Sequence, residues 1–282
     1  MRNPYRTQKI AFFFMFLATL LIVVPVGLIV VVIIQKGLPA INWQFLTDIP
    51  RQGMRAGGIF PAIVGTVYLV LGAILFALPI GLMAAIYLSE YARDNFLTRM
   101  IRLAIVNLAG VPSVVYGLFG LALFVVFFKF GVSILSGSLT LAIMILPIII
   151  TTSREALESV PYSFREVSYS LGASKWQTIR NIVLPNAIPG ILTGTILGLG
   201  RAAGETAPIL FTVAAFYLPQ LPGSILDQAM ALPYHLYVIS TQVPNVDEKV
   251  RYGTALVLLT LVLFMNLVAI IIRYQFRKKK KW

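Results

Sequence analysis

The chain is 282 residues long and 59% hydrophobic, with a mean hydropathy of +0.88. So much apolar surface cannot be buried in one soluble core of this size, which excludes an ordinary soluble domain. The net charge of +13 would suit a nucleic-acid binder, but the placement of the basic residues along the chain explains it differently.

Six apolar runs are each long enough to cross a bilayer as a helix. In chain order they are Ile10–Ile34, Ile59–Leu88, Leu103–Phe128, Val132–Ser153, Ala187–Leu218 and Tyr252–Ile272. The fourth is the weakest, because Ser133, Ser136, Gly137 and Pro147 interrupt it. The first is too long for a removable signal peptide and has no small-residue cleavage site after it. We expect one all-α, polytopic membrane domain over residues 1–282, with an N-terminal span (10–34) and a core (59–273).

Basic residues divide unequally between the two sides of these spans. Three precede the first span, three lie between the second and third, four between the fourth and fifth, and six follow the last; only six lie on the opposite side. The positive-inside rule therefore predicts that both termini are cytoplasmic. The excess charge reflects topology and contact with anionic membrane lipid, so we do not expect nucleic-acid binding.

The sequence contains no recognisable catalytic set. No segment reads G-x-x-x-x-G-K-[ST], the loop that cradles ATP phosphates. His235 is the only histidine and there is no cysteine, so no metal site is expected. Gly198, Gly200 and Gly204 miss the dinucleotide-binding spacing by one residue. We expect a non-catalytic chain that binds no cofactor itself.

A polar stretch separates the fourth and fifth apolar runs. Ser163 followed by Glu166 has the form of a capping box, which would begin a short helix. Gly172 is suited to end that helix, because glycine adopts the left-handed conformation at no steric cost. Ser174 and Gln177 form a second capping box. The pattern predicts two short helices joined at a glycine turn, either resting passively on the lipid surface or serving a partner.

The spacing E-x5-G-x9-I-x-L-P in this stretch resembles the EAA signature of permease subunits of ABC-type importers. Val167 and Ser168 replace the two alanines of that signature, a mild departure. In that family the loop forms a coupling helix that docks on a separate ATPase subunit. The resemblance implies a cytoplasmic coupling loop over residues 154–186. Its coupling residues would be Glu166, Leu171, Gly172, Ala173, Ile182, Leu184 and Pro185.

Two charged residues, Arg201 and Glu205, fall within the fifth span and are four apart, so they can pair on one helix face. A charge near the centre of a bilayer costs roughly 2.5–3.5 kcal/mol on insertion scales. One interpretation is an ion pair that fixes helix packing. The other is that the guanidinium attracts an anion, since its fork of donors suits phosphate or carboxylate oxygens, and the carboxylate prevents tight trapping.

Small residues share the broad face of this ion pair. They are Gly190, Gly194, Gly198, Gly204 and Pro208. Small residues permit close approach of a neighbouring helix, and they equally leave room for a solute. The sequence leaves both alternatives open.

Four further segments resemble phosphate importer permeases of the PstA type. They are Gly57–Thr66, Asn107–Phe124, Gly200–Leu210 and Ala231–Tyr237. The resemblance implies a six-helix type I ABC importer permease in the plasma (inner) membrane. Its implied partners are a PstC-type permease, a PstB-type ATPase dimer that holds ATP and Mg, and a PstS-type phosphate-binding protein. It also implies that Arg201 and Glu205 belong to the phosphate pathway.

Other interpretations stay open at this point. The same architecture would serve another oxyanion, such as sulfate or molybdate. An ion-driven secondary transporter would use Arg201 and Glu205 as a relay, although no internal repeat supports it. A non-transporting scaffold is the weakest alternative. On the outer side, Arg51 and Arg55 form either an anion entry or an ordinary solvated loop, and 219–251 is expected to hold a short helix or two on the outer rim.

Overall fold

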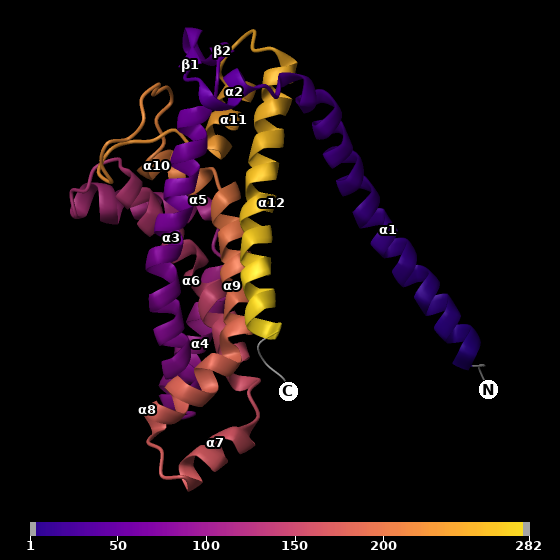
Figure 1. Ribbon diagram of the computed structural model, residues 1–282, viewed down its shortest axis with the longest axis vertical. Coiled ribbons are helices and arrows are strands. Elements are labelled where there is room, and N and C mark those ends of the chain that lie inside the picture. The colour runs from indigo at the N-terminus through magenta and orange to yellow at the C-terminus, as the bar shows by residue number, and fades with distance from the viewer. Residues whose placement is uncertain (1–3, 279–282) are drawn as a thin grey trace.

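The structure, a computed structural model, describes residues 4–278 as a bundle of long helices (Figure 1). A two-stranded hairpin lies at one end, with β1 (Pro50–Arg51) antiparallel to β2 (Ala56–Gly57). The helices are α1 (Pro4–Gly37), η1 (Leu38–Ala40), α2 (Trp43–Thr47), η2 (Gln52–Met54), α3 (Phe60–Ile86), η3 (Tyr87–Tyr91), α4 (Phe96–Ala109), α5 (Ser113–Gly120), η4 (Leu121–Phe127), α6 (Ile134–Glu158), α7 (Tyr162–Ser170), α8 (Lys175–Thr178), η5 (Ile179–Val183), α9 (Leu184–Gly204), α10 (Ala207–Thr212), α11 (Leu232–Thr241) and α12 (Glu248–Lys278). Of the η elements, η3, η4 and η5 are π-helical.

Within residues 4–278, five helical stretches are long and apolar enough to cross a membrane, and one bent pair of helices brings the number to six. The five are Ala11–Ala40, Phe60–Tyr91, Ile134–Glu158, Lys175–Gly204 and Glu248–Lys278. The bent pair is Phe96–Ala109 with Ser113–Phe127. The all-α, polytopic fold expected from the sequence is confirmed.

The third predicted span, 103–128, is wrong as one continuous helix. The chain bends by 103° between α4 and α5. Pro112 lies in the bend, where it cannot donate a backbone hydrogen bond and disfavours a helical conformation in the residue before it. The hydroxyl of Tyr116 donates to the carbonyl of Leu108 at 2.7 Å, which fastens the two arms together.

The fifth predicted span, Ala187–Leu218, is displaced along the chain. Helix runs without interruption through α8, η5 and α9, and it stops at Gly204. Glu205 has extended backbone angles, φ −79° and ψ 135°, and only the short α10 follows it. Hydropathy alone could not locate this end, because the residues beyond it are as apolar as those before it.

The fourth span, expected to be the weakest, is the most buried. In α6, 67% of the apolar stretch is buried, against 33% in the spans of α3 and α9 that pack beside it. Met144 and Ile149 are completely buried. The serines do not interrupt the helix: Ser133 caps its start by accepting the backbone N–H of Ser136. α6 therefore forms the centre of the bundle.

The first span stands apart from the bundle (Figure 1). Its apolar stretch is 0% buried. It is joined to α12 at one end only, where Gly37 lies against the backbone of Tyr252 and Lys36 pairs with Glu248 at 2.7 Å. Within residues 4–278, no other element covers the apolar surface of α1 along most of its length.

The segment expected on the outer rim contains one helix, α11, and that helix is buried. The backbone N–H of Leu232 donates to the Thr66 hydroxyl of α3 at 2.8 Å. The side chain of His235 is 3% exposed, and its Nδ1 atom has no hydrogen-bond partner among the described residues. Burial lowers the pKa of His235 from 6.5 to about 4, because the charged imidazole would lose its hydration.

This histidine should make stability depend on pH. Below pH 6.5 the unfolded chain takes up a proton that the folded chain does not accept until about pH 4. Stability is therefore fully present above pH 6.5 and decreases by about 3 kcal/mol as the pH falls towards 4. Melting temperatures in detergent across this range should fall more steeply for the wild type than for His235→Leu. Equal slopes would contradict the burial of a neutral imidazole.

Candidate functional site

The polar stretch forms a helical hairpin beyond the ends of the long helices, where α7 and α8 lie (Figure 1). Gly172 ends the α7 turn with φ +80°, the left-handed conformation expected of it. At the start of α8, Ser174 and Gln177 form a complete capping box. The Ser174 backbone N–H donates to Gln177 Oε1 at 2.7 Å, and the Gln177 N–H donates to Ser174 Oγ at 3.3 Å. The glycine turn and the second capping box are confirmed.

The first predicted capping box is wrong. Pro161 occupies the N-cap position of α7, and no side chain caps that end. Because the helix already begins at Tyr162, Ser163 lies inside the first turn and cannot take the N-cap role. Proline supplies the start instead, since its missing N–H costs nothing there.

The residues assigned to coupling divide into an exposed tip and a partly buried root. Glu166, Leu171 and Gly172 are exposed, whereas Ala173, Ile182, Leu184 and Pro185 are partly buried. At the tip, three large apolar side chains are exposed: Val167 is 61% exposed, Leu171 83% and Trp176 51%. A cluster of large apolar side chains in this state is typical of a surface that contacts another protein.

The root is held by its own small hydrophobic cluster. Ile179 and Val183 of η5 are completely buried there. They pack with Ile86 at the end of α3 and with Leu157 and Val160 at the end of α6. The segment from α7 to η5 is therefore attached to the ends of two membrane helices and is continuous with a third, α9.

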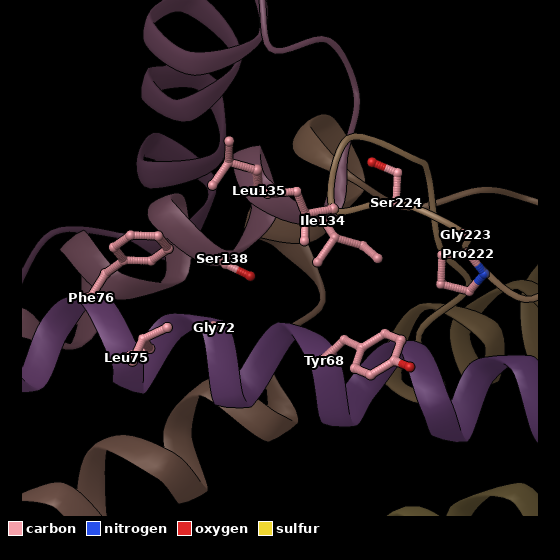
Figure 2. Close-up of a pocket in the computed structure, with 11 residues that line it drawn as sticks. Tyr68, Gly72, Leu75, Phe76, Ile134, Leu135, Ser138, Pro222, Gly223 and Ser224 are labelled. Atoms are coloured by element: carbon pink, nitrogen blue, oxygen red, sulfur yellow. The ribbon is translucent and has the colours of Figure 1, made fainter.

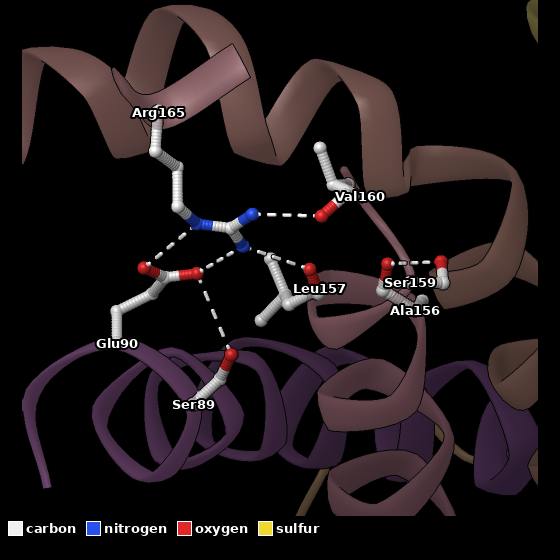
Figure 3. Close-up of polar contacts among 7 residues, drawn as sticks. All are labelled: Ser89, Glu90, Ala156, Leu157, Ser159, Val160 and Arg165. Carbon is white, nitrogen blue, oxygen red and sulfur yellow. Dashed lines mark hydrogen bonds and ion pairs between the residues drawn. The ribbon is translucent and has the colours of Figure 1, made fainter. Parts of the chain in front are cut away.

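Sequence reasoning missed the polar contact at this attachment. Arg165 of α7 pairs with Glu90 of η3 at 2.7 Å, and the two side chains are 9% and 6% exposed (Figure 3). Arg165 also donates to the carbonyl of Val160 at 2.8 Å and to that of Leu157 at 3.0 Å. The partners are 75 residues apart in the chain, so no local spacing could indicate the pair.

The second region expected to be functional lies at the other end of α9. Arg201 Nε lies 3.5 Å from Glu205 Oε1, so the expected ion pair is present. The side chains are 29% and 20% exposed. The two residues do not share one helix face as expected, because α9 ends between them at Gly204. The charges therefore sit at a break in a membrane helix, where α10 begins and packs against α5.

The small residues near this pair serve two different purposes. Gly190 and Gly194 lie against Ala156 and Thr152 of α6, so close that a side chain at Gly194 would overlap the threonine hydroxyl. Gly190 and Gly194 therefore allow α9 to approach α6 closely. A Cβ at Gly204, in contrast, would meet no atom within 4 Å. Open space remains beside the ion pair.

A separate cavity of about 370 Å³ lies between α3, the start of α6 and residues 222–225 (Figure 2). Its lining includes Leu75 and Phe76 with the hydroxyl groups of Tyr68 and Ser138, and no charged side chain. It is therefore unsuited to an oxyanion. Elsewhere at this end, Arg51 pairs with Asp48 at 3.0 Å and is 61% exposed, which favours the ordinary solvated loop.

The family model described as "Binding-protein-dependent transport system inner membrane component" matches residues 77–282. The chain belongs to this family. It is 33% identical over 266 residues to the probable ABC transporter permease protein YqgI of Bacillus subtilis, covering 89% of this chain and 90% of that one. It is 35% identical over 272 residues to the phosphate transport system permease protein PstA of Mycobacterium leprae, covering 95% and 88%. The chain is thus an ABC importer permease that resembles the PstA type, as expected.

Solved structures agree on the fold. A chain of a bacterial ABC transporter involved in the import of the acidic polysaccharide alginate superposes with a TM-score of 0.63 at 17% identity, covering 93% of this chain and 96% of that one. A chain of the MetNI methionine ABC transporter in an inward-facing conformation gives 0.58 at 16% identity, covering 78% and 94%. The architecture is that of type I ABC importer permeases.

The packing of α9 on α6 can be tested with one substitution at two positions. Gly194→Ala places a methyl group against the Thr152 side chain and should lower the free energy of unfolding by about 1–3 kcal/mol. Gly198→Ala is the matched control, because its nearest neighbours would lie 3.5 Å away. It should be neutral or stabilise by up to about 1 kcal/mol, since alanine favours helix. Melting temperatures in detergent that fall equally for both would contradict this packing.

Proposed function

We propose that this permease is the membrane subunit of an ATP-driven phosphate importer. The observation that carries the anion assignment is the Arg201–Glu205 pair at the break after α9, with open space beside Gly204. A guanidinium bound to one carboxylate oxygen keeps donors available for the oxygens of an anion. The similarity to relatives named phosphate transport system permease proteins supports phosphate in particular.

The Arg201–Glu205 pair suits an anion that passes through, not one that stays tightly bound. An anion that approaches Arg201 must compete with Glu205 for the guanidinium, and the carboxylate repels it at the same time. Broken helices at membrane depth are common at transporter substrate sites, because the irregular backbone is tolerated where it lines a cavity. We infer that phosphate passes this break and is released once the carboxylate pairs again with the arginine.

Helix α9 connects this pathway to the source of energy. The helical stretch Lys175–Gly204 begins in the coupling segment and ends beside the ion pair. At about 1.5 Å per residue it spans roughly 40 Å. A partner that displaces α8 therefore also displaces Arg201, because both belong to the same uninterrupted helical stretch. Alternating access then follows as a two-state change biased by the partner.

The proposed partners bind at defined places. A PstB-type ATPase dimer, which would hold ATP and Mg, docks on the exposed apolar tip formed by Val167, Leu171 and Trp176. That end is cytoplasmic if the termini follow the positive-inside rule. A PstC-type permease completes the pathway as a heterodimer, and a PstS-type protein delivers phosphate at the opposite end. The chain itself performs no hydrolysis in this scheme.

A guanidinium suits any tetrahedral oxyanion, so sulfate or molybdate is the second candidate. The deciding experiment is uptake of labelled phosphate into proteoliposomes holding the assembled complex, ATP and the binding protein. ATP-dependent uptake that excess sulfate and molybdate do not reduce would support phosphate. Uptake that either anion suppresses would assign the chain to another oxyanion importer, and uptake independent of ATP would refute an ATP-driven importer.

Arg201→Gln should abolish uptake and leave the assembled complex intact. Glutamine keeps hydrogen-bonding groups but removes the charge, and loss of a charged contact worth about 1.4 kcal/mol or more lowers uptake at least about tenfold. Arg99→Gln, which breaks an exposed pair with Asp94, is the control and should transport normally. Initial uptake rates at equal amounts of purified complex make the comparison. Normal uptake by the Arg201→Gln variant would show that Arg201 does not contact phosphate on its way through the permease.

Gly172→Val should uncouple ATP hydrolysis from transport. A β-branched residue at φ +80° is strained by about 1–3 kcal/mol, so the turn that sets the direction of α7 would change. Gly172→Asn is the matched variant, because asparagine tolerates this conformation, and it should stay largely coupled. Phosphate uptake and ATP hydrolysis measured on the same proteoliposomes give the ratio. A valine variant with the wild-type ratio would contradict the docking assignment.

A further inference from the structure

The buried pair at the base of α7 joins three elements in one contact. Arg165 reaches from α7 to the Glu90 carboxylate of η3, with its Nη2 at 2.7 Å and its Nε at 3.4 Å (Figure 3). Its Nη2 also donates to the carbonyl of Leu157 in the last turn of α6, and its Nη1 donates to that of Val160, just beyond the end of α6. Of the ion pairs among residues 4–278, this is the most buried.

This arrangement fixes orientation as well as distance. A guanidinium that binds a carboxylate through two nitrogens holds it in one plane. The C-terminal carbonyls of α6 carry partial negative charge that also favours the cation. A buried arginine cannot leave these partners without remaining unpaired, so α7 cannot turn relative to η3 and α6 at little cost.

Two weaker contacts extend the same attachment to α8. Lys175 lies over the ring of Tyr91 at 4.8 Å from its centroid. The hydroxyls of Ser168 and Thr178 lie 2.8 Å apart and are buried, which joins α7 to α8. Only residues 159–161 link α6 to α7 in the chain, and they are not helical. The ion pair therefore adds directional bonds to a non-helical link that is otherwise held by the packing of Val160.

We propose that Arg165 and Glu90 are positioning residues for energy coupling, which hold α7, η3 and the end of α6 as one rigid unit through the transport cycle. The proposal rests on the proposed function, in which an ATPase moves the exposed tip at Leu171. When the tip moves, the Arg165 contacts then move the ends of α3 and α6, while α8 moves α9 with it. Three membrane helices move together, and motion is not lost at residues 159–161.

The first test separates coupling from assembly. Arg165→Met and Glu90→Gln remove one partner each, and Arg99→Met breaks the exposed Arg99–Asp94 pair as the matched control. Phosphate uptake and ATP hydrolysis are measured on the same proteoliposomes. Uptake per ATP should fall about fivefold or more for the buried pair, with hydrolysis retained. The double variant should be no worse than Arg165→Met, because the two residues act as one contact. An Arg165→Met complex with the wild-type ratio would overturn the proposal.

The second test leaves the ion pair intact, so it does not depend on how the truncated variants fold. The chain has no cysteine, which allows Tyr91→Cys with Lys175→Cys to be joined by a reducible bifunctional maleimide linker. These positions face each other across the same attachment. A rigid unit predicts that uptake persists after linking at the level of the unlinked double variant. Loss of uptake on linking that returns on reduction would mean that the attachment opens during transport, and would overturn the proposal.

The wild-type complex in the same experiment distinguishes the two levels of inference. If the wild type shows no ATP-dependent phosphate uptake, the proposed function fails. If the wild type transports phosphate and either test gives its overturning result, the importer assignment stands and only the rigid attachment is wrong.

Discussion

The close approach of α9 to α6 is the contact on which the rest of the structure depends. Gly190 and Gly194 allow the backbone of α9 to lie against Ala156 and Thr152. Helices in a bilayer gain little from the hydrophobic effect when they associate, so small residues that permit dense van der Waals contact decide which pairs form. α6 is itself the most buried span, and it packs against α3 as well. The helix that ends at the Arg201–Glu205 pair is therefore held against the most buried span of the bundle.

The break after α9 places two costly features in the same location. Backbone groups that leave a helix inside a membrane need partners, and so do charged side chains. Here the end of α9, the Arg201–Glu205 pair and the start of α10 lie together, with α5 packed against α10. Gly117 of α5 permits that contact, because a side chain there would meet the Pro208 backbone. The irregular backbone and the charges thus lie in one region, next to the contact between α10 and α5.

The segment from α7 to η5 reverses the distribution of polar and apolar groups that is usual in soluble proteins. Its charged pair, Glu90 with Arg165, is buried, whereas Val167 and Leu171 are exposed. An isolated soluble helix pair would place these groups the other way round. This distribution suits a segment whose ion pair fixes it to its own chain. Its exposed apolar side chains are then available to pack against a partner protein.

The sequence by itself determined the number of apolar spans, the glycine turn at Gly172 and the capping box of Ser174, because each depends on hydropathy or spacing within a few residues. It also placed the two charges of the fifth span within reach of each other. Only the tertiary structure decided the bend at Pro112, the end of α9 between those charges, and which glycines pack on a neighbour. It alone brought Glu90 to Arg165. These features depend on contacts between segments distant in the chain, and local patterns of hydropathy and capping carry no information about such contacts.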